Sequence, residues 1–500
     1  MRRSMATLLA VVAMVFALAA PAAAAQAAGF STSYQAIPGD GGTTLHALVI
    51  RPTGRGDGPF PLVVLPSSWG VNDIEYVGAA AKLAYQSGYV VVSYTARGFW
   101  DSGGQIEVAG PQDVADASKV IDWALANTDA DPSRIGMGGI SYGAGISLLA
   151  AAADPRIRAV ASMSGWTDLA ASLYPNQTVS AQGVDLLLAA AHLTGRPGPD
   201  LRKAEQDYLD GDFADVLPIA PVRSAATKID AINQHGVAVL MANAWEDSLF
   251  PPSQLVDFYG KLTGPKRLML TPGDHATPEV FGAAGLPNDV WDAADRWFDH
   301  YLLGVDNGVD RQPPVQVKPA NGGGWQGSTG FPTQQQTIPL GSTRFNAGFD
   351  TGADSGTVFV SGTLQGYLGI PTGVAMPLVA RSAAAVWSGP AAAQGFEVDG
   401  TPHARLTVTP SAADTTLFAY LYDVGPLGLG SLITHKPYSL LGANPGAAKD
   451  IDLGLEPIAW NVPAGHHLAL VVDTVDPRYL SSSKVGSTVA LSGTLTVPVT

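Results

Sequence analysis

Short apolar runs alternate with helix-length amphipathic segments from about residue 30 to about residue 310. Apolar runs rich in β-branched residues predict buried strands, and the longer segments between them predict helices. This alternation is typical of a parallel sheet with helices on both faces. The predicted strands are 45–51, 62–65, 89–94, 134–137, 157–163, 237–242 and 267–271, and the predicted helices are 74–87, 112–127, 142–153, 253–262 and 289–303.

One stretch interrupts the alternation. Residues 166–234 contain several helical pieces and no clear strand, although predicted strands flank the stretch on both sides. Open α/β sheets bind their ligands at the carboxyl ends of the strands, and an insertion at that edge covers the binding crevice. The stretch therefore predicts a helical cap over the ligand-binding edge of the sheet.

The pattern changes near residue 310. From there on, helical periodicity almost disappears, and short alternating runs are separated by Thr, Gly, Ser and Pro, which predicts a β-sandwich or jelly roll. We therefore expect an α/β domain over 28–311 and an all-β jelly-roll domain over 312–500, with glycines 322–324 as a flexible connector. The expected strands of the second domain include 357–361, 404–408, 417–422, 467–472 and 488–497.

The first residues have a pattern of their own. Arg2 and Arg3 precede an apolar run over 5–20, and an alanine-rich stretch follows at 22–28. A basic start, an apolar middle and small residues at the end are typical of a secretory signal peptide. We expect residues 1–27 to be removed and the protein to be secreted, with an uncleaved membrane anchor as the alternative. The rest of the chain lacks a run of about 18 apolar residues, so we expect no membrane association after cleavage.

Composition excludes several classes of function. The formal net charge is −15, with 28 Lys and Arg against 43 Asp and Glu, and such a surface repels nucleic acids. The absence of cysteine excludes disulfides, thiolate nucleophiles and thiolate metal sites. The adjacent His466 and His467 lack a third ligand nearby, so they predict packing rather than a metal site. No glycine-rich nucleotide motif occurs in the right context, and we infer no cofactor.

The chemistry-bearing motif is Gly-Ile-Ser-Tyr-Gly at 139–143, which has the pattern G-x-S-x-G. It follows a predicted strand and opens a predicted helix, as a nucleophile elbow does. Glycines at both ends of the motif allow the strand and the helix to approach closely around the sharp turn. The motif predicts that Ser141 is a catalytic nucleophile; the alternative is an ordinary glycine-rich turn.

A serine nucleophile needs a general base, which is most often a histidine. His275 comes directly after the predicted strand 267–271, so it can reach the carboxyl edge of the sheet. His192 falls in the predicted cap, His235 precedes a strand, and His300 lies inside the last helix. Position along the chain therefore favours His275.

The third member of such a site is a carboxylate that orients the imidazole. Asp247 lies in the loop after the predicted strand 237–242, and Glu246 is its close rival. Asp274 is the direct neighbour of His275, and neighbouring side chains seldom face each other well enough for this bond. We expect Asp247 to orient the imidazole. The alternative for each of these carboxylates is that it is an ordinary loop or cap residue.

An oxyanion hole requires two donors aimed at the developing negative charge. The backbone N–H of Tyr142, directly after the nucleophile, is the first expected donor. The second is expected from the loop at 66–70, and we select Trp69. The alternative for Trp69 is an aromatic side chain that lines the pocket.

Together with the elbow, further segments resemble the X-Pro dipeptidyl-peptidase and cocaine-esterase type of serine hydrolase. The resemblance implies an α/β-hydrolase fold with a helical cap, a galactose-binding-like jelly roll, and an acyl-enzyme mechanism that uses Ser141, Asp247 and His275. The segments that carry it, besides GISYG, are TARG at 95–98, DSGG at 101–104, RWFDHYLLG at 296–304, FEVDG at 396–400 and PAGH at 463–466.

The chain departs from this family at one position. Members often use a tyrosine after the first core strand as an oxyanion donor, whereas residues 67–70 read SSWG here. We expect a secreted serine hydrolase that cleaves a small peptide or ester and needs no cofactor. A homo-oligomer is possible on the sequence alone. The alternatives are a carboxylesterase or acylase without dipeptide preference, and an inert hydrolase-like binding protein.

Overall fold

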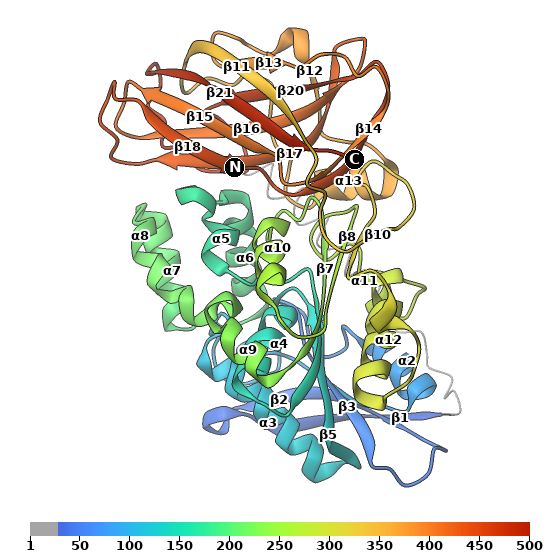
Figure 1. The fold of residues 1–500 in the computed structure, drawn as a ribbon. Coiled ribbons are helices and arrows are strands. Elements are labelled where there is room, and N and C mark those ends of the chain that lie inside the picture. The colour runs from blue at the N-terminus through green and yellow to red at the C-terminus, as the bar shows by residue number, and fades with distance from the viewer. Residues whose placement is uncertain (1–28) are drawn as a thin grey trace.

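The protein consists of an α/β domain and an all-β domain, which we call the β domain, in direct contact with it (Figure 1). This computed structural model describes residues 29–500, so the predicted signal peptide at 1–27 lies outside the described residues. In the described part of the chain, every helix is too short or too polar to cross a membrane.

The sheet of the α/β domain contains ten strands within the described residues, in the order β1-β2-β4-β3-β5-β6-β7-β8-β9-β10. Strands β3 to β9 run parallel, as predicted, whereas β1, β2 and β10 are antiparallel to their neighbours and make the sheet mixed at its edges. The strand predicted at 45–51 is β2, so its expected parallel direction is wrong. The bounds are β1 (Phe30–Pro38), β2 (Thr44–Pro52), β3 (Phe60–Pro66), β4 (Val90–Tyr94), β5 (Ala130–Ile140), β6 (Ile157–Met163), β7 (Ala238–Ala244), β8 (Lys266–Thr271), β9 (Val315–Val317) and β10 (Gln326–Ser328).

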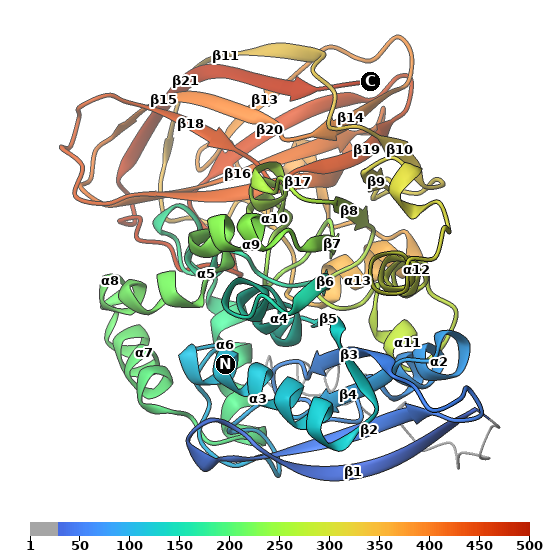
Figure 2. The same ribbon diagram turned by 60° about the horizontal axis from the view of Figure 1, so that its bottom comes forward.

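Helices cover both faces of this sheet. Apolar side chains of α3, α4, α9 and α10 pack on one face, and those of α2, α11 and α12 pack on the other. Figure 2 shows the sheet between these two layers. The bounds are α2 (Val77–Ser87), α3 (Pro111–Asn127), α4 (Tyr142–Ala153), α9 (Ile229–His235), α10 (Pro252–Lys261), α11 (Val280–Ala283) and α12 (Asp289–Leu303).

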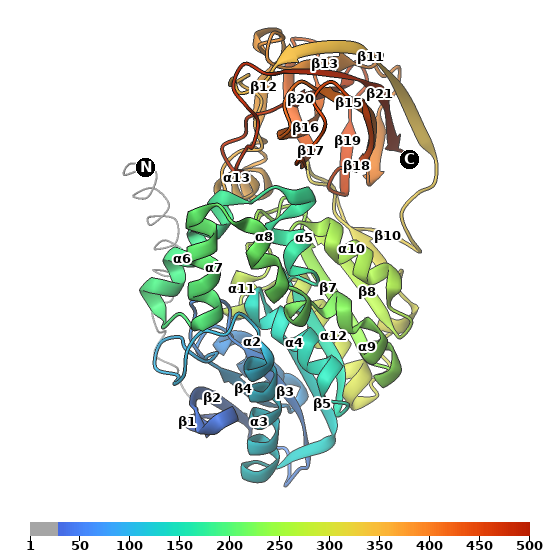
Figure 3. The ribbon, with the colours of Figure 1, turned by 90° about the vertical axis from the view of Figure 1, so that its left-hand side faces the viewer.

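The insertion between β6 and β7 is helical, as predicted for 166–234. It contains α5 (Leu169–Leu173), α6 (Ala181–Thr194), α7 (Pro199–Asp210) and α8 (Phe213–Val216), joined by short 3₁₀ turns, before α9 rejoins the sheet. In Figure 3, α5 and α8 lie next to the β domain, and Asn176 donates a hydrogen bond of 3.0 Å to the carbonyl of Pro437 there. The cap therefore contacts both domains.

The β domain is built from antiparallel sheets, as the jelly-roll prediction requires. Within the described residues their orders are β11-β21-β15-β18, β12-β17-β16-β20-β13 and β14-β19. The bounds are β11 (Gln335–Asn346), β12 (Gly373–Ala375), β13 (Ala385–Ser388), β14 (Phe396–Gly400), β15 (His403–Pro410), β16 (Thr415–Val424), β17 (Leu429–Leu440), β18 (Lys449–Gly454), β19 (Ile458–Val462), β20 (His467–Asp473) and β21 (Thr488–Pro498).

The central strand of the five-stranded sheet, β16, is buried on both faces. Every residue of β16 is buried, because alternate side chains belong to two different apolar clusters. Leu417, Ala419 and Leu421 face the other sheet of the sandwich, whereas Phe418 and Tyr420 face a layer of loops.

Three expectations differ from the structure. The hydrolase-type sheet continues through β9 and β10, beyond the boundary expected at residue 311, and glycines 322–324 join these two strands rather than the two domains. The expected strand at 357–361 is wrong, because this segment leads into the helix α13 (Val360–Leu368). The edge strand β1 was not predicted, since most of its residues are partly or fully exposed and its polar residues mask the periodicity.

Glycine 136 in β5 permits close packing of α12 on the sheet. A Cβ atom there would lie 2.8 Å from Leu302 Cδ1 and 3.0 Å from Phe298 Cδ1. We expect Gly136→Ala to lower the free energy of unfolding by about 1–3 kcal/mol through overpacking. Gly260→Ala, on the exposed side of α10 with no atom within 4 Å, should instead stabilise by up to about 1 kcal/mol. Chemical denaturation measures both; equal losses would contradict the packing argument.

Candidate active site

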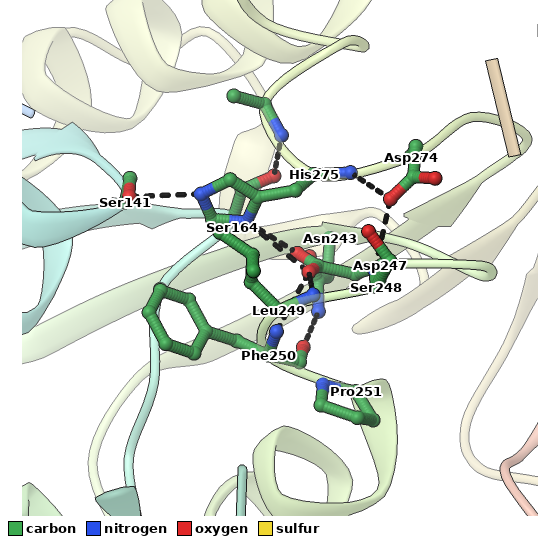
Figure 4. Close-up of polar contacts among 12 residues, drawn as sticks. Ser141, Ser164, Asn243, Asp247, Ser248, Leu249, Phe250, Pro251, Asp274 and His275 are labelled. Carbon is green, nitrogen blue, oxygen red and sulfur yellow. Dashed lines mark hydrogen bonds and ion pairs between the residues drawn. The ribbon is translucent and has the colours of Figure 1, made fainter. Parts of the chain in front are cut away.

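Three side chains from separate loops meet at the carboxyl edge of the α/β sheet (Figure 4). Ser141 follows β5, Asp247 follows β7, and His275 follows β8. His275 Nε2 lies 2.8 Å from Ser141 Oγ, and His275 Nδ1 lies 3.0 Å from Asp247 Oδ2. The structure thus brings together the alcohol, imidazole and carboxylate that the sequence singled out, and all three are buried.

Ser141 occupies a strained turn between β5 and α4. Its φ of 57° and ψ of −117° lie in a region that non-glycine residues rarely adopt. Gly143 is required beside it, because a Cβ atom there would lie 2.0 Å from the carbonyl oxygen of Pro66 on β3. A hydrogen bond of 2.9 Å from the Ser141 N–H to the Met163 carbonyl anchors the turn to β6. The turn therefore projects the hydroxyl above the sheet, as a nucleophile elbow does.

Asp247 is fixed by its own loop. Its Oδ1 accepts backbone hydrogen bonds from Leu249 at 3.0 Å and from Phe250 at 2.7 Å. Both carboxylate oxygens face the imidazole, with Oδ1 at 3.1 Å and Oδ2 at 3.0 Å from His275 Nδ1. Among the described residues, neither rival carboxylate bonds to the His275 ring. Glu246 accepts a long bond of 3.4 Å from the Gly273 N–H, and burial raises its pKa well above the ordinary value.

Asp274 has a supporting position instead. Its Oδ1 accepts hydrogen bonds from the backbone N–H groups of Ser248 at 2.8 Å and of His275 at 2.7 Å. Ser248 directly follows Asp247, and His275 is the residue whose ring contacts Ser141. Asp274 therefore ties the loop of Asp247 to the loop of His275.

The other candidate histidines lie elsewhere. His192 contacts Glu205 on the surface of the cap, His235 bonds to the carbonyl of Ala151, and His300 bonds to the carbonyl of Val305. Each of the three is satisfied by local partners, so the structure leaves His275 as the imidazole beside Ser141.

The environment of His275 favours its protonated form. Burial alone would lower the pKa of the imidazole, but the negative charge of Asp247 and its hydrogen bond outweigh that effect, with a further contribution from Asp274. The net pKa of His275 is raised above its ordinary value. The edges of Phe250 and Phe359 enclose the ring at centroid distances of 5.1 Å and 5.7 Å.

A second polar group lies behind His275. Ser164, which follows β6 with a positive φ of 45°, accepts a hydrogen bond of 3.1 Å from the Ala276 N–H and donates one of 2.9 Å to Glu279. Burial raises the pKa of Glu279 to about 7. This pair holds the backbone that follows His275, and the sequence offered no motif by which to find it.

The expected oxyanion donors belong to residues whose rings are in contact. Tyr142 is the first residue of α4, and Trp69 packs its ring edge-on against the Tyr142 ring at 5.1 Å. In residues 29–500, neither backbone N–H donates to a protein acceptor, whereas the Ser68 N–H is occupied by Glu75 at 2.7 Å. The Trp69 indole also donates a hydrogen bond to the Leu187 carbonyl of the cap at 2.9 Å. The position of Trp69 is therefore compatible with a backbone oxyanion donor and with an aromatic side chain that lines the pocket.

Aromatic side chains surround the three polar groups. The ring of Trp166 lies 5.9 Å from that of Tyr142 and 5.2 Å from that of Phe250, and Phe99 lies 5.0 Å from Trp69. The β domain contributes Phe359, which the sequence placed in a strand and which therefore escaped notice. The immediate wall of the site is thus apolar.

Metal ligation has no support in the described part of the chain, where no group of three or more His, Asp or Glu residues could hold an ion. His466 bonds through Nδ1 to Asp423 at 2.8 Å, which accounts for one of the paired histidines by packing.

Comparison with known families assigns the chain. The model of the X-Pro dipeptidyl-peptidase (S15 family) matches residues 40–277, and the model of the X-Pro dipeptidyl-peptidase C-terminal non-catalytic domain matches residues 307–495. The chain belongs to the X-Pro dipeptidyl-peptidase (S15) family. This membership confirms the resemblance drawn from the sequence and makes the chain a serine hydrolase, peptidase or esterase.

Two curated relatives show the extent of the S15 match. A putative Xaa-Pro dipeptidyl-peptidase of Streptomyces avermitilis is 25% identical over 391 residues, which cover 68% of this chain and 52% of the relative. The Xaa-Pro dipeptidyl-peptidase of Lacticaseibacillus casei is 22% identical over 482 residues, which cover 78% and 59%. This S15 chain thus spans about half the length of the first relative.

A solved structure of an α-amino acid ester hydrolase superposes with a TM-score of 0.74 at 14% identity, covering 96% of this chain and 98% of the other. A CocE/NonD family hydrolase from Staphylococcus aureus superposes with a TM-score of 0.70 at 14% identity, covering 95% and 97%. These likenesses confirm the α/β-hydrolase fold followed by an all-β domain for this S15 member.

The raised pKa of His275 can be measured without any substrate. We expect nuclear magnetic resonance of labelled histidine to give a pKa above 6.5 for this ring. Asp247→Asn should lower it, because the favourable negative charge is removed while burial remains. Glu246→Gln serves as the matched control and should leave the titration unchanged; a shift of similar size there would assign the interaction to the wrong carboxylate.

Proposed function

We propose that the protein hydrolyses small acyl substrates through a covalent intermediate on Ser141. The observation that supports this proposal is the bridge formed by His275, which contacts Ser141 Oγ through one ring nitrogen and Asp247 through the other. Such a bridge allows the imidazole to accept the hydroxyl proton while the carboxylate stabilises the resulting positive charge.

The proposed steps follow from these contacts. Ser141 Oγ attacks the carbonyl carbon of the substrate, and its proton moves to His275 Nε2. The backbone N–H groups of Tyr142 and Trp69 stabilise the oxyanion; losing one such donor would raise the barrier by about 3–4 kcal/mol. His275 then protonates the leaving group, and a water molecule releases the acyl group from Ser141 by the same steps.

The apolar wall favours neutral acyl groups. A free amino terminus of a peptide needs an available carboxylate in the pocket, and the nearby carboxylates already accept protein hydrogen bonds, with Glu279 Oε1 as the one buried oxygen among them that has no partner in the described residues. Asp113 accepts a bond of 2.9 Å from the Tyr142 hydroxyl, Asp274 accepts two backbone bonds, and Glu279 accepts one from Ser164. We therefore propose ester hydrolysis as the main activity. Cleavage after Xaa-Pro is the second candidate, supported by the family models.

The two candidates separate in one assay. We expect the full chain to turn over a short-chain aryl ester, with at least about tenfold lower kcat/KM for a Xaa-Pro anilide. The anilide has the poorer leaving group, and its free amino terminus lacks a partner in the site. Ser141→Ala should reduce ester turnover by about 10⁴-fold or more. A fluorophosphonate should label the wild type at Ser141 alone.

A faster Xaa-Pro reaction would replace the ester assignment with the peptidase one. Absence of both turnover and labelling at Ser141 would instead support an inert binding protein.

We also propose that the protein acts outside the cell, because residues 1–27 have the composition of a signal peptide. Expression of the full chain in a bacterial host that exports proteins should yield a mature product that begins after Ala25 or Ala27. Mass spectrometry of the intact protein from the medium measures this. Recovery of the uncleaved chain from the membrane fraction would support the anchor instead.

A further inference from the structure

The β domain places one buried arginine next to the active-site loops. Arg478 follows β20 in the loop 474–487, and only 5% of its surface is exposed. Its Nη1 donates to the Ser355 carbonyl at 3.2 Å and its Nη2 to the Ser248 carbonyl at 3.4 Å. Within the described residues, Arg478 forms no ion pair inside 4.0 Å, and its Nε has no hydrogen-bond partner. Burial of a guanidinium without an ion pair costs free energy unless negative charges lie nearby.

The contact with Ser248 matters because this residue follows Asp247. Every polar group of Ser248 is engaged: the N–H donates to Asp274, the hydroxyl accepts from the Phe359 N–H at 3.2 Å, and the carbonyl accepts from Arg478. Two of these three partners belong to the β domain. The backbone that carries Asp247 is therefore clamped between the loop of His275 and the β domain.

The helical cap also contacts the loop that carries Arg478. Gln182 of α6 donates from its backbone to the Arg478 carbonyl at 3.1 Å, and its side chain accepts from the Val358 N–H at 3.1 Å. Asp476 holds the arginine loop in turn, since its carboxylate accepts bonds from the N–H groups of Ser355 and Arg478, each at 2.8 Å. Three parts of the fold thus converge on Arg478.

The charges of Arg478 and Asp274 also influence each other without direct contact. Burial raises the pKa of Asp274, and hydrogen bonding by Ser248 and the positive charge of Arg478 oppose that rise. The pKa of Arg478 is itself raised, since nearby negative groups outweigh the effect of burial. The titratable groups around Arg478 and Asp274 come from both domains. Those of the α/β domain are Glu246, Asp247, Asp274, His275 and Glu279, and those of the β domain are Asp354, His435, Lys436, Asp476 and Tyr479.

We propose that Arg478 is a positioning residue through which the β domain fixes the two loops that carry Asp247 and His275. It contacts neither the substrate nor the reacting atoms; it acts through Ser248 and Asp274. Asp274 accepts both backbone bonds that join the loops, and the positive charge of Arg478 opposes the rise of the Asp274 pKa that burial causes. The role in turnover rests on the proposed hydrolase function, whereas the coupling between Arg478 and Asp274 does not.

The test compares Arg478→Gln with the wild type over a range of pH. In the variant, the acid limb of kcat/KM should move up by roughly half to one pH unit, because the pKa of Asp274 rises further without the positive charge and protonation weakens its two backbone bonds. Arg478→Lys, which keeps the charge, should restore the wild-type midpoint. Arg478→Gln combined with Asp274→Asn should also restore it, since residue 274 then has no group that titrates.

A matched control separates this effect from loosened domain contact. Lys436 of β17 makes another polar bridge between the domains, donating to Ser253 Oγ at 2.8 Å and pairing with Glu456. Lys436→Gln should leave the acid-limb midpoint in place. An equal shift in this control, an unchanged midpoint in Arg478→Gln, or no restoration in the double variant would each overturn the proposal.

A second readout is independent of activity. The folded-state pKa of Asp274 lies above its ordinary value, so its ionisation destabilises the folded chain as the pH rises, and more so without Arg478. The difference in melting temperature between the wild type and Arg478→Gln should therefore widen as the pH rises above the ordinary pKa of an aspartate. A difference that stays constant with pH would leave only a structural role and overturn the proposal, even if no hydrolysis is found.

Discussion

The sharp turn at Ser141 is the constraint on which the rest of the site depends. Its unfavourable φ is maintained because β3, β6 and α4 surround it closely, with Gly143 touching Pro66 and the Ser141 N–H bound to Met163. A strained residue of this kind persists only where the surrounding structure fixes it more strongly than the strain costs. The buried parallel strands provide that rigidity, and they set the position to which the other loops must be fitted.

Local sequence patterns predict much of this arrangement. The elbow motif, the strands on either side of it and the helix over 289–303 follow from periodicity and glycine placement, and the structure has them at or near the predicted positions. Asp247 and His275 were found by a topological argument, since parallel strands bring the loops after them to one edge. The edge strand β1 gave no such signal, because half-exposed strands carry few apolar residues.

Contacts between distant segments were beyond the reach of sequence patterns. Phe359 and Arg478 lie far along the chain from Asp247, yet both reach Ser248. The stretch around 357–361 looks like a strand, but α13 forms there because its glycines fit the loop of His275: a Cβ at Gly362 would lie 2.8 Å from Asp274, and one at Gly366 would lie 2.7 Å from Gly273. Tertiary packing overrides local preference at such positions.

The sheet around β16 also limits how such proteins can be recombined. Its outer face, with Phe418 and Tyr420, is covered by loops of the β domain, among them the loop 474–487, which carries Tyr479 and Arg478. A β domain transplanted onto another catalytic half would keep its sandwich core but would present a mismatched surface to the new partner. The two halves are therefore best regarded as one inherited unit, and chimeras should exchange the loop 474–487 and α13 together with the strands that they cover.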